Sequence, residues 1–323
     1  MHNMLDCVLG VDGGGTGTTA VLVAPDGVEL GRGEAGPSNY VVSGAPAAAE
    51  AVAEAVRQAL RAAPPGVRLR AAAFCLAGIA GPADAGHMRQ ALCQTAVPLP
   101  EWAAAVERAR LAHDALAALV GGCGRLVGVV VIAGTGSIAF GRAADGRELR
   151  AGGWGWLAGD EGSAFELGRR ALQAAARAAD GRGPATALLA MLLAELGCTS
   201  MEELVRRFTP GPELRGRVAA LAPLVFRIAE TGDAAAQQLV SSAAAELALA
   251  AVTVLRGLGL DLTPTPVVMQ GGLFRHHALL REGFAAMLSH QAPAARPLEP
   301  QHDAAYGAAL LALDDAGWAR LAG

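Results

Sequence analysis

The sequence predicts an α/β protein with two domains, and three observations support this prediction. The chain has 323 residues, which is more than one hydrophobic core usually holds. Apolar strands alternate with glycine-rich loops and helices, as in a wound α/β sheet. The opening plan of strand, Gly/Thr loop, strand and Asp-Gly turn then returns from residue 126 onward, which indicates an internal duplication.

The first half is predicted to open with a β-hairpin and to continue as strand–loop–helix units. Residues 7–12 form a short apolar run that ends in an acid and three glycines, as in a buried strand entering a turn. The further strands predicted here are 18–24, 28–34, 71–76 and 105–112. The predicted helices are 47–62, 84–95 and 114–120.

The second half repeats this plan around a long helical stretch. Residues 162–257 are mostly helical in pattern, with breaks at 181–184, 197–200, 210–212 and 232, which indicates a helical insertion in the second domain. The predicted strands are 126–132, 138–142 and 266–270, and the predicted helices after the insertion are 275–289 and 304–313.

Composition excludes several classes of protein. A net charge of -4 leaves no electrostatic footprint for nucleic acid or for an anionic membrane. The apolar run 126–133 is too short to span a bilayer, and Glu246 interrupts the run 240–255. Five cysteines without a CxxC pair favour reduced thiols over a disulfide framework or a zinc site. Residues 1–8 lack the features of a signal peptide, so we expect a cytoplasmic protein.

The first candidate site is the loop that follows the first strand. Its glycines let the backbone approach phosphate oxygens, and Thr16 and Thr18 add hydroxyl donors. Asp12 at the strand end is placed to hold Mg²⁺, directly or through water. A strand follows, and no Gly-Lys-Ser/Thr is present, so this is neither a Rossmann fingerprint nor a Walker A loop. A simple hairpin turn is the alternative. The three glycines are Gly13, Gly14 and Gly15.

Two further glycine turns support nucleotide binding. Gly134-Thr135-Gly136-Ser137 again lies between two predicted strands, and two such hairpins facing one another would clamp a triphosphate. Gly271 and Gly272 follow a third strand and would let a flat ligand such as adenine lie against the backbone. For this pair, an ordinary strand-to-helix connection is the competing interpretation.

A Gly/Trp segment at 152–156 and the run 159–163 suggest a sugar site. Tryptophan can pack on the apolar face of a sugar, and an aspartate such as Asp160 can accept hydrogen bonds from its hydroxyls. The alternative places the tryptophans in the core, with Asp160 and Ser163 capping the next helix. We expect one of Trp154 and Trp156 to belong to the core, and Asp160 to cap and bind.

Asp114 is the candidate catalytic base. It follows a predicted strand and opens a helix, where an acid is also a common N-cap. Transfer of a phosphoryl group to a hydroxyl needs an acid or histidine near the γ-phosphate, and Asp114 and Asp160 are the best-placed acids by strand-end position. The adjacent His113 is expected to point elsewhere.

These motifs carry a resemblance to a known family. The sequence resembles the N-acetylglucosamine kinase-like group of the BadF/BadG/BcrA/BcrD ATPase family, within the sugar kinase, Hsp70 and actin superfamily. The resemblance covers nearly the whole chain. The matching motifs are Gly10-Val11-Asp12-Gly13-Gly14-Gly15-Thr16, Gly36-Pro37-Ser38-Asn39, His113-Asp114-Ala115, Ala133-Gly134-Thr135-Gly136-Ser137, 152–155, Gly159-Asp160-Glu161-Gly162-Ser163 and Gln270-Gly271-Gly272.

The resemblance implies two ribonuclease-H-like (actin-like ATPase) domains with an interdomain cleft that holds ATP. The first domain would comprise residues 1–116 and a C-terminal helix in 304–323, and the second 117–303 with its helical insertion at about 163–257. Many family members are dimers, so a homodimer is expected.

The resemblance also implies an activity: transfer of the γ-phosphate of Mg·ATP to the 6-hydroxyl of an amino sugar, foremost N-acetylglucosamine. Asp114 would take the proton, and both Gly/Thr loops would hold phosphates, with Gly271 and Gly272 beside adenosine. Two departures, Gly17 and Ile138, bear on one phosphate and one sugar contact. Alternatives are a glucosamine or N-acetylmuramic acid kinase, a BadF-type ATPase activator and a non-catalytic sugar sensor. The sugar site would comprise Asn39, Asp114, Ser137, Gly153, Trp154 and Asp160.

Overall fold

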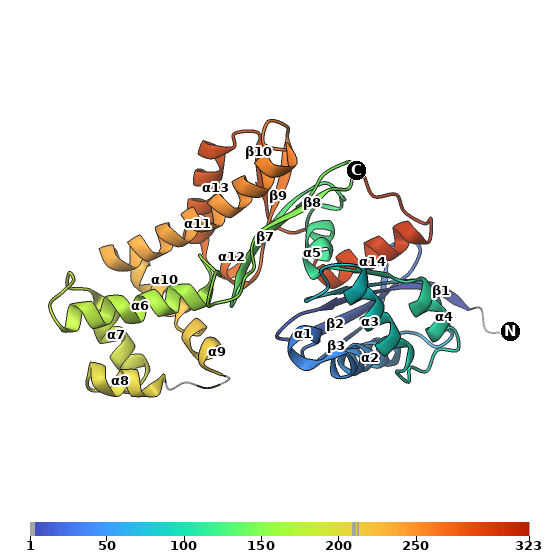
Figure 1. Cartoon of the computed structure of the whole chain (residues 1–323), viewed down its shortest axis with the longest axis horizontal. Coiled ribbons are helices and arrows are strands. Elements are labelled where there is room, and N and C mark those ends of the chain that lie inside the picture. Colours follow the sequence, from blue (N-terminus) through green and yellow to red (C-terminus); the bar gives the residue numbers. More distant parts are fainter. Residues whose placement is uncertain (1–3, 209–210, 212, 323) are drawn as a thin grey trace. The chain divides into compact units, whose positions relative to one another are not determined.

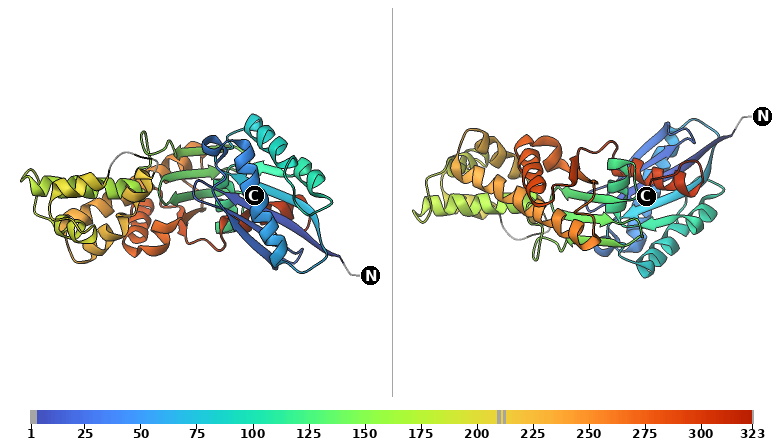
Figure 2. Two further views of the ribbon diagram at one scale, coloured as in Figure 1. Left: turned by 90° about the horizontal axis from the view of Figure 1, so that it is seen from below. Right: turned by 90° about the horizontal axis from the view of Figure 1, so that it is seen from above.

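The computed structural model describes residues 4–208, 211 and 213–322. Its chain divides into two compact units, each with one five-stranded sheet covered by helices (Figures 1 and 2). The first unit comprises Met1–Gly128, Ala143–Asp145 and Glu299–Gly323, and the second comprises Val129–Arg142 and Gly146–Leu298. The changes between units therefore fall at other residues than those expected from the resemblance.

The sheet of the first unit has the strand order β3-β2-β1-β4-β5. Strands β1, β2 and β3 form an antiparallel meander, and β4 and β5 continue the sheet parallel to β1. This parallel part brings the carboxyl ends of β1, β4 and β5 to one edge. The strands are β1 Leu5–Gly13, β2 Thr18–Val23, β3 Glu29–Ala35, β4 Val67–Leu76 and β5 Arg110–Ala112.

Helices cover both faces of this sheet. Helix α2 packs on β2 and β3, and α14 packs on β1 and β4 beside α5. The contact of α14 with β1 is close: a Cβ on Gly10 would lie 2.1 Å from the backbone nitrogen of Ala309. The helices are α1 Tyr40–Ser43, α2 Ala45–Ala62, α3 Pro82–Cys93, α4 Trp102–Arg108, α5 Asp114–Cys123 and α14 Ala304–Asp315.

One strand prediction in this unit was largely wrong. Of the predicted strand 105–112, only β5 at its end is a strand, and the preceding residues belong to helix α4. The helix buries Trp102, Ala105 and Val106, which recur at helical rather than strand spacing. The Trp102 indole packs edge-on against Phe74, and its N–H donates to the carbonyl oxygen of Leu92. This anchored tryptophan holds the helix on the core.

The second unit repeats the sheet of the first. Its order, β8-β7-β6-β9-β10, corresponds strand by strand to β3-β2-β1-β4-β5, with a glycine loop between the first two strands of each unit. The predicted internal duplication is therefore confirmed at the level of topology. Strands β8 and β10 were not predicted. The strands are β6 Gly128–Ala133, β7 Ser137–Arg142, β8 Glu148–Gly152, β9 Thr265–Gln270 and β10 Ala295–Leu298.

The predicted helical insertion is confirmed. One predicted break contains Pro210 and Pro212, which lie outside the described residues, and the predicted helix 275–289 is divided at His277. The helices are α6 Ala164–Ala179, α7 Ala187–Glu195, α8 Met201–Arg207, α9 Leu214–Ala219, α10 Ala222–Glu230, α11 Ala234–Leu258, α12 Gly272–His276 and α13 Ala278–Gln291.

Helix α11 is the core helix of this unit. Within the described part of the chain, it is the one helix long and apolar enough to cross a membrane, but half of its most apolar window is buried inside the protein. It packs against α10, α13 and strand β7. We therefore interpret its hydrophobicity as that of a core helix, as predicted for 240–255.

Candidate functional site

The first glycine loop joins β1 to β2 and is fastened by backbone hydrogen bonds. The N–H of Gly14 donates to the carbonyl oxygen of Gly17 at 2.9 Å, and the N–H of Ala77 donates to that of Gly13 at 2.7 Å. The N–H of Ser38 donates to the carbonyl oxygen of Gly14. The loop is thus tied to the ends of both β3 and β4.

The glycines of this loop differ in what surrounds them. A Cβ on Gly13 would lie 2.1 Å from Ser38 Oγ and 2.6 Å from a Leu76 methyl, so packing within the protein requires glycine there. A Cβ on Gly14 would meet only the Gly17 oxygen, at 3.8 Å, and a Cβ on Gly15 would meet nothing within 4 Å. Neither residue has a positive φ. The fold itself therefore leaves Gly14 and Gly15 open, as a ligand-binding backbone requires.

The two threonines of the loop have different surroundings. Thr16 is exposed. Thr18 is 2% exposed, and its hydroxyl lies 2.7 Å from the carbonyl oxygen of Gly36 and 2.8 Å from Ser38 Oγ. Thr18 was predicted to donate to phosphate, but its hydroxyl here fastens the loop to the segment that leads to Asn39.

Two carboxylates lie at the edge where the parallel strands of the first unit end. Asp12 on β1 is in register with Cys75 on β4, and Cys75 is in register with Ala112 at the end of β5, just before Asp114. The pKa of Asp12 is raised to about 7, chiefly by burial and in smaller part by the negative charges of Asp114 and Asp303. An anionic Asp12 is therefore disfavoured unless a cation lies nearby.

Asp114 is partly accessible and does not stand alone. Its side chain is 26% exposed, and one carboxylate oxygen accepts a hydrogen bond from the N–H of Ala115 at 2.9 Å. His113 Nδ1 lies 2.8 Å from the same oxygen and is the N-cap acceptor of α5. The expectation that His113 points elsewhere was wrong, because the N-cap position turns its ring back over the first turn of the helix.

Asn39 opens the short helix α1, where its side chain accepts a hydrogen bond from the N–H of Val41 at 3.2 Å. The loop after β4 approaches it closely: a Cβ on Gly78, whose φ is +97°, would lie 3.1 Å from Asn39 Oδ1. The Tyr40 hydroxyl donates to Asp84 on α3. The structure thus joins Asn39 to the loop after β4, which the sequence did not single out.

The second glycine loop, Gly134–Ser137, joins β6 to β7 and is held by charged groups. The N–H of Ser137 donates to Asp160 Oδ1 at 3.2 Å, and Arg215 of α9 donates to Asp160 Oδ2 at 2.8 Å. A Cβ on Gly136 would lie 2.5 Å from an Arg215 nitrogen and 2.7 Å from Asp160 Oδ1. A Cβ on Gly134, by contrast, would meet nothing within 4 Å.

The first turn of helix α6 is hydrogen-bonded to this loop. The carbonyl oxygens of Gly134 and Thr135 accept hydrogen bonds from the N–H groups of Ala164 and Phe165, in the first turn of the helix. Ser163 caps α6 by accepting from Glu166 N, and the Glu166 carboxylate accepts from the N–H of Gly162, the residue before the N-cap. The helix N-terminus is therefore occupied by the protein itself.

Asp160 does not cap α6 with its side chain. The carboxylate is buried, with 4% of the side chain exposed, and both oxygens are engaged by Ser137 and Arg215. Among the described residues, Asp160 is the only non-glycine with a positive φ, +64°. Holding an aspartate in this left-handed conformation costs on the order of 1 kcal/mol, and such strain is typical of functional positions.

Gly271 and Gly272 lie between β9 and α12. Gly271 has a φ of +103°, and a Cβ there would lie 2.3 Å from the carbonyl oxygen of Ala133, so the close approach of β6 requires glycine. Gly272 is exposed, and a Cβ on it would meet nothing within 4 Å. Only the second glycine therefore leaves backbone open to a ligand.

The expectation that one tryptophan belongs to the core was wrong. Trp154 is 66% exposed and Trp156 is 52% exposed. The guanidinium of Arg150 lies over the Trp154 ring at 4.5 Å, and Trp156 meets Phe165 edge-on. Glycines at positive φ turn this segment outward, which presents the indoles to solvent rather than to the core.

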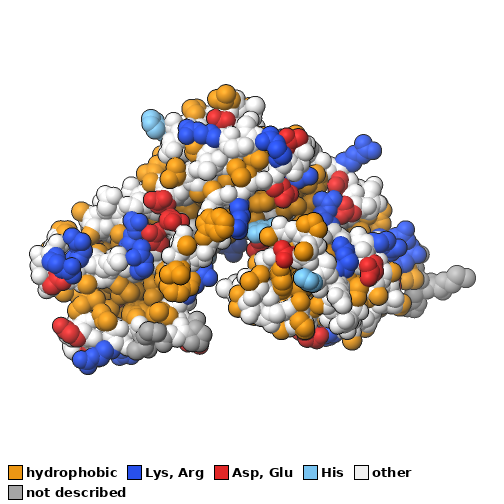
Figure 3. Space-filling model, in the orientation of Figure 1, with side chains coloured by type: hydrophobic (Ala, Val, Ile, Leu, Met, Phe, Trp, Pro, Cys, Tyr) orange, Lys and Arg blue, Asp and Glu red, His pale blue; other side chains and the backbone are white. Residues whose placement is uncertain are grey.

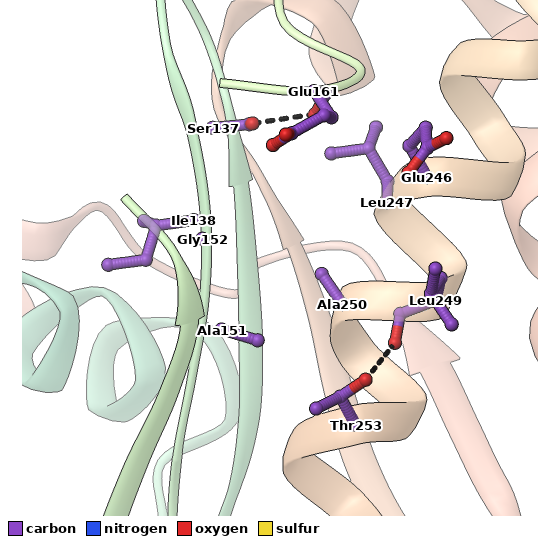
Figure 4. Close-up of a pocket in the computed structure, with 10 residues that line it drawn as sticks. All are labelled: Ser137, Ile138, Ala151, Gly152, Glu161, Glu246, Leu247, Leu249, Ala250 and Thr253. Atoms are coloured by element: carbon purple, nitrogen blue, oxygen red, sulfur yellow. Dashed lines mark hydrogen bonds between the residues drawn. The ribbon is translucent and has the colours of Figure 1, made fainter. Parts of the chain in front are cut away.

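A pocket of about 200 Å³ lies in the second unit between the β7–β8 hairpin and α11 (Figure 4). Ser137, Glu161 and Glu246 are its principal polar side chains, and Leu247 and Ala250 contribute apolar surface. The Ser137 hydroxyl donates to the Glu161 carbonyl oxygen at 2.6 Å. Of the predicted sugar-binding residues, only Ser137 lines this pocket, so we do not assign the sugar to it.

Sequence reasoning assigned no role in the site to three residues of this region. Ser38, fully buried, packs under Gly13, His113 contacts Asp114, and Arg215 contacts Asp160. The position of His113 beside an acid at a helix start was a usable signal. Arg215 gave none, because it lies 55 residues after Asp160 in a helical segment rich in arginine.

Known proteins are similar in sequence to this chain. An N-acetylmuramic acid/N-acetylglucosamine kinase of Clostridium acetobutylicum is 32% identical over 200 residues, which is 62% of this chain and 65% of that enzyme. An N-acetyl-D-glucosamine kinase of Dictyostelium discoideum is 36% identical over 205 residues, 62% of this chain and 64% of that enzyme. The matched segments thus span less than two thirds of either curated relative.

Structure and family comparisons extend over more of the chain. A crystal structure from Chromobacterium violaceum, provisionally assigned as an N-acetylglucosamine kinase, is 30% identical with a TM-score of 0.73 and covers 96% of this chain and 99% of that chain. The fold with two ribonuclease-H-like domains is thereby confirmed. The family model of the BadF/BadG/BcrA/BcrD ATPases matches residues 9–312. This chain therefore belongs to the BadF/BadG/BcrA/BcrD ATPase family.

Proposed function

We propose that this protein is an ATP-dependent kinase that transfers the γ-phosphate to the 6-hydroxyl of an amino sugar, foremost N-acetylglucosamine. The observation that carries the proposal is the joint placement of Asp12 and Asp114 at one sheet edge, beside a loop whose Gly14 and Gly15 are open. The names of the similar proteins, two of which are N-acetylglucosamine kinases, supply the substrate class.

The glycine loops are proposed to bind ATP. Gly13–Thr16 and Gly134–Gly136 would hold phosphate groups through backbone N–H donors, and Gly271–Gly272 would lie beside adenosine. The support is that each segment includes a glycine whose added Cβ would meet nothing within 4 Å. Thr18 would contribute by fastening the first loop, since its hydroxyl lies against Gly36 and Ser38.

Mg²⁺ is proposed as the metal, held by Asp12 directly or through water. Within the described residues, no group of three or more His, Cys, Asp or Glu is arranged to hold a metal ion. A single carboxylate, that of Asp12, fits Mg²⁺, which commonly uses one or two carboxylates and takes its other oxygens from water and phosphates. When bound, Mg²⁺ would neutralise phosphate charge, and the raised pKa of Asp12 supports a cation there, because a positive charge would favour the ionised carboxylate.

Asp114 is proposed as the base. Its carboxylate would orient the sugar hydroxyl and take its proton as the oxygen attacks the γ-phosphate, while positioning supplies most of the rate. Asp114 suits this role better than Asp160, because 26% of its side chain is exposed against 4%. The N–H of Ala115, which donates to the same carboxylate at 2.9 Å, would hold it in position.

The sugar is proposed to contact Asn39 and the Gly153–Trp154 segment, with Ser137 and Asp160 shaping the site. Trp154 offers an exposed indole face, on which a sugar ring can pack. We also propose a cytoplasmic homodimer that does not bind nucleic acid or membranes. On the face shown in Figure 3, arginine and acidic side chains are interspersed rather than gathered into one basic surface.

The test is ADP release from Mg·ATP with a panel of sugars: N-acetylglucosamine, glucosamine, N-acetylmuramic acid, N-acetylmannosamine and glucose. We expect strong stimulation by N-acetylglucosamine. Stimulation by glucosamine or N-acetylmuramic acid alone would name another acceptor for the same activity. Persistent ATPase activity that no sugar stimulates would refute the proposal and favour an ATP-driven activator, whereas nucleotide and sugar binding without turnover would favour a sugar sensor.

A further inference from the structure

The guanidinium of Arg215 is only partly satisfied by the protein. One terminal nitrogen donates to Asp160 Oδ2 at 2.8 Å, but Nε is buried and has no hydrogen-bond partner. Within the described chain, the only other buried side-chain nitrogen or oxygen without a partner is Gln270 Oε1. Buried polar atoms are almost always paired, so an unpaired one calls for a ligand or another explanation.

Both unpaired atoms belong to residues around the second glycine loop. A Cβ on Gly136 would lie 2.5 Å from an Arg215 terminal nitrogen, so the guanidinium lies against that loop. Gln270 at the end of β9 is in register with Ile132 at the end of β6, two residues before Gly134. The guanidinium therefore lies at Gly136, two residues after the open Gly134 of the same loop.

The chemistry of Arg215 suits an oxyanion. The chain contains no lysine, so every fixed side-chain cation is an arginine. A guanidinium carries five N–H donors in a planar fork that matches phosphate oxygens, and Asp160 accepts from only one of them here. Asp160 is 4% exposed and Arg215 is 41% exposed, so the carboxylate anchors a guanidinium that a ligand can still reach.

We propose that Arg215 binds phosphate oxygens of the nucleotide at the second glycine loop, and that Asp160 is the positioning residue that holds its guanidinium. The inference rests on the proposed function only in taking this loop as a phosphate site. A sugar carboxylate, as in N-acetylmuramic acid, is also an anion whose oxygens accept hydrogen bonds from a guanidinium. The experiment distinguishes this carboxylate from the nucleotide phosphates.

The experiment measures binding to the full chain by calorimetry, with Mg²⁺ present, for the ATP analogue AMPPNP, ADP and adenosine. Arg215→Gln should weaken AMPPNP and ADP binding by about 10-fold to 100-fold, the effect of losing a charge-assisted hydrogen bond, and should leave adenosine within about 2-fold. The AMPPNP and ADP affinities of Arg215→Lys should lie between those of Arg215→Gln and the wild type, because lysine keeps the positive charge but lacks the planar set of N–H donors.

Arg217→Gln is the matched control. Arg217 lies on the same helix, but its guanidinium lies over the Phe208 ring at 5.6 Å, and we expect wild-type affinity for all three ligands. Unchanged AMPPNP affinity in Arg215→Gln would overturn the proposal, as would an equal loss for adenosine. If Arg215→Gln fails to fold, the ratio of AMPPNP to adenosine affinity in Arg215→Lys decides.

The sugar arm separates the other anion. In Arg215→Gln, we expect the KM values for N-acetylmuramic acid and N-acetylglucosamine to change by the same factor. A selective increase for the acidic sugar, with AMPPNP affinity unchanged, would overturn the phosphate assignment. The nucleotide measurements need no sugar, so a chain that phosphorylates no sugar would refute the proposed function and still test Arg215.

Discussion

The two glycine loops are built on the same plan but are held by different chemistry. Each has one glycine that the protein's own packing requires, Gly13 in the first loop and Gly136 in the second. Each also has a glycine with open space, Gly14 in the first and Gly134 in the second. Hydroxyls and backbone groups fasten the first loop, whereas the second is fastened by a carboxylate–guanidinium pair.

This difference suggests that the two loops have different chemical roles. The unit of the first loop carries the acids Asp12 and Asp114, whose charges repel one another. The second loop carries a cation, Arg215, whose charge Asp160 offsets. A duplicated fold has thus kept the two backbone loops and specialised the side chains beside them. The first would serve proton and metal chemistry, and the second would serve phosphate charge.

The largest effect is expected from removing the acid beside the first loop. Asp114→Asn should lower turnover by roughly 100-fold or more, because a positioned base is lost. AMPPNP affinity should stay within about 3-fold, since the side chain is assigned to the sugar and not to the nucleotide. Single-turnover kinetics and calorimetry measure the two quantities. Wild-type turnover in this variant would remove Asp114 from the role of base.

The next effect concerns the open glycine of the first loop. Gly14→Val should weaken AMPPNP binding by about 10-fold to 100-fold, because its branched side chain would occupy the phosphate approach at a steric cost of about 1–3 kcal/mol. The melting temperature should hardly change, because nothing but the Gly17 oxygen, at 3.8 Å, lies near the new Cβ. Unchanged affinity would exclude this loop from the nucleotide site.

The packed and open glycines of the second loop give a matched pair. Gly136→Ala should destabilise the fold by about 1–3 kcal/mol, because the new Cβ would lie within 3 Å of Arg215 and Asp160. Gly134→Ala should leave stability nearly unchanged, because a Cβ there meets nothing within 4 Å. Denaturant titration measures both. Equal stabilities of Gly136→Ala and Gly134→Ala would show that Arg215 and Asp160 can move aside at little cost.

The smallest effect is the pH dependence set by Asp12. Its pKa is raised from 3.8 to about 7, so between these values the folded chain holds a proton that the unfolded chain has lost. This contribution to stability disappears as the pH rises through about 7. Asp12→Asn cannot lose it, so its stability relative to wild type should increase by on the order of 1 kcal/mol between about pH 6 and pH 8.

Thermal melts of nucleotide-free protein in a chelating buffer measure this difference at both pH values. If the melting temperatures of the wild type and Asp12→Asn changed by the same amount between the two pH values, the raised pKa of Asp12 would be contradicted. Added Mg²⁺ and AMPPNP should reduce the difference, because a bound cation offsets the charge of an ionised Asp12.

Much of the fold could be predicted because local patterns decide it. The run before Asp12 is apolar and ends in glycines, and in the structure it is the central strand β1. The segment 105–112 was misassigned because the helical spacing of buried residues begins at Trp102, before the predicted strand, and the packing of Trp102 fixes that helix on the core. Strands β8 and β10 at the sheet edges have only five and four residues, which gives little periodic signal.

The site could be predicted only where glycines and acids cluster along the chain. The placement of Asp114 followed from its position after a strand. The register that sets Ala112, just before Asp114, opposite Cys75 could be seen only in the sheet. Arg215 and Asp160 meet only through tertiary packing, and no short-range pattern records that contact. The exposure of Trp154 and Trp156 depends on positive-φ glycines, whose backbone angles the sequence does not specify.

The left-handed backbone of Asp160 has a consequence for engineering. Glycine would adopt this conformation without strain, so Asp160→Gly should recover on the order of 1 kcal/mol at the backbone while losing the carboxylate that holds Arg215. The lost carboxylate outweighs that gain, because the Ser137 N–H and the Arg215 guanidinium would lose their acceptor. A search for thermostable variants that scored backbone strain alone would therefore select a substitution that weakens the second glycine loop.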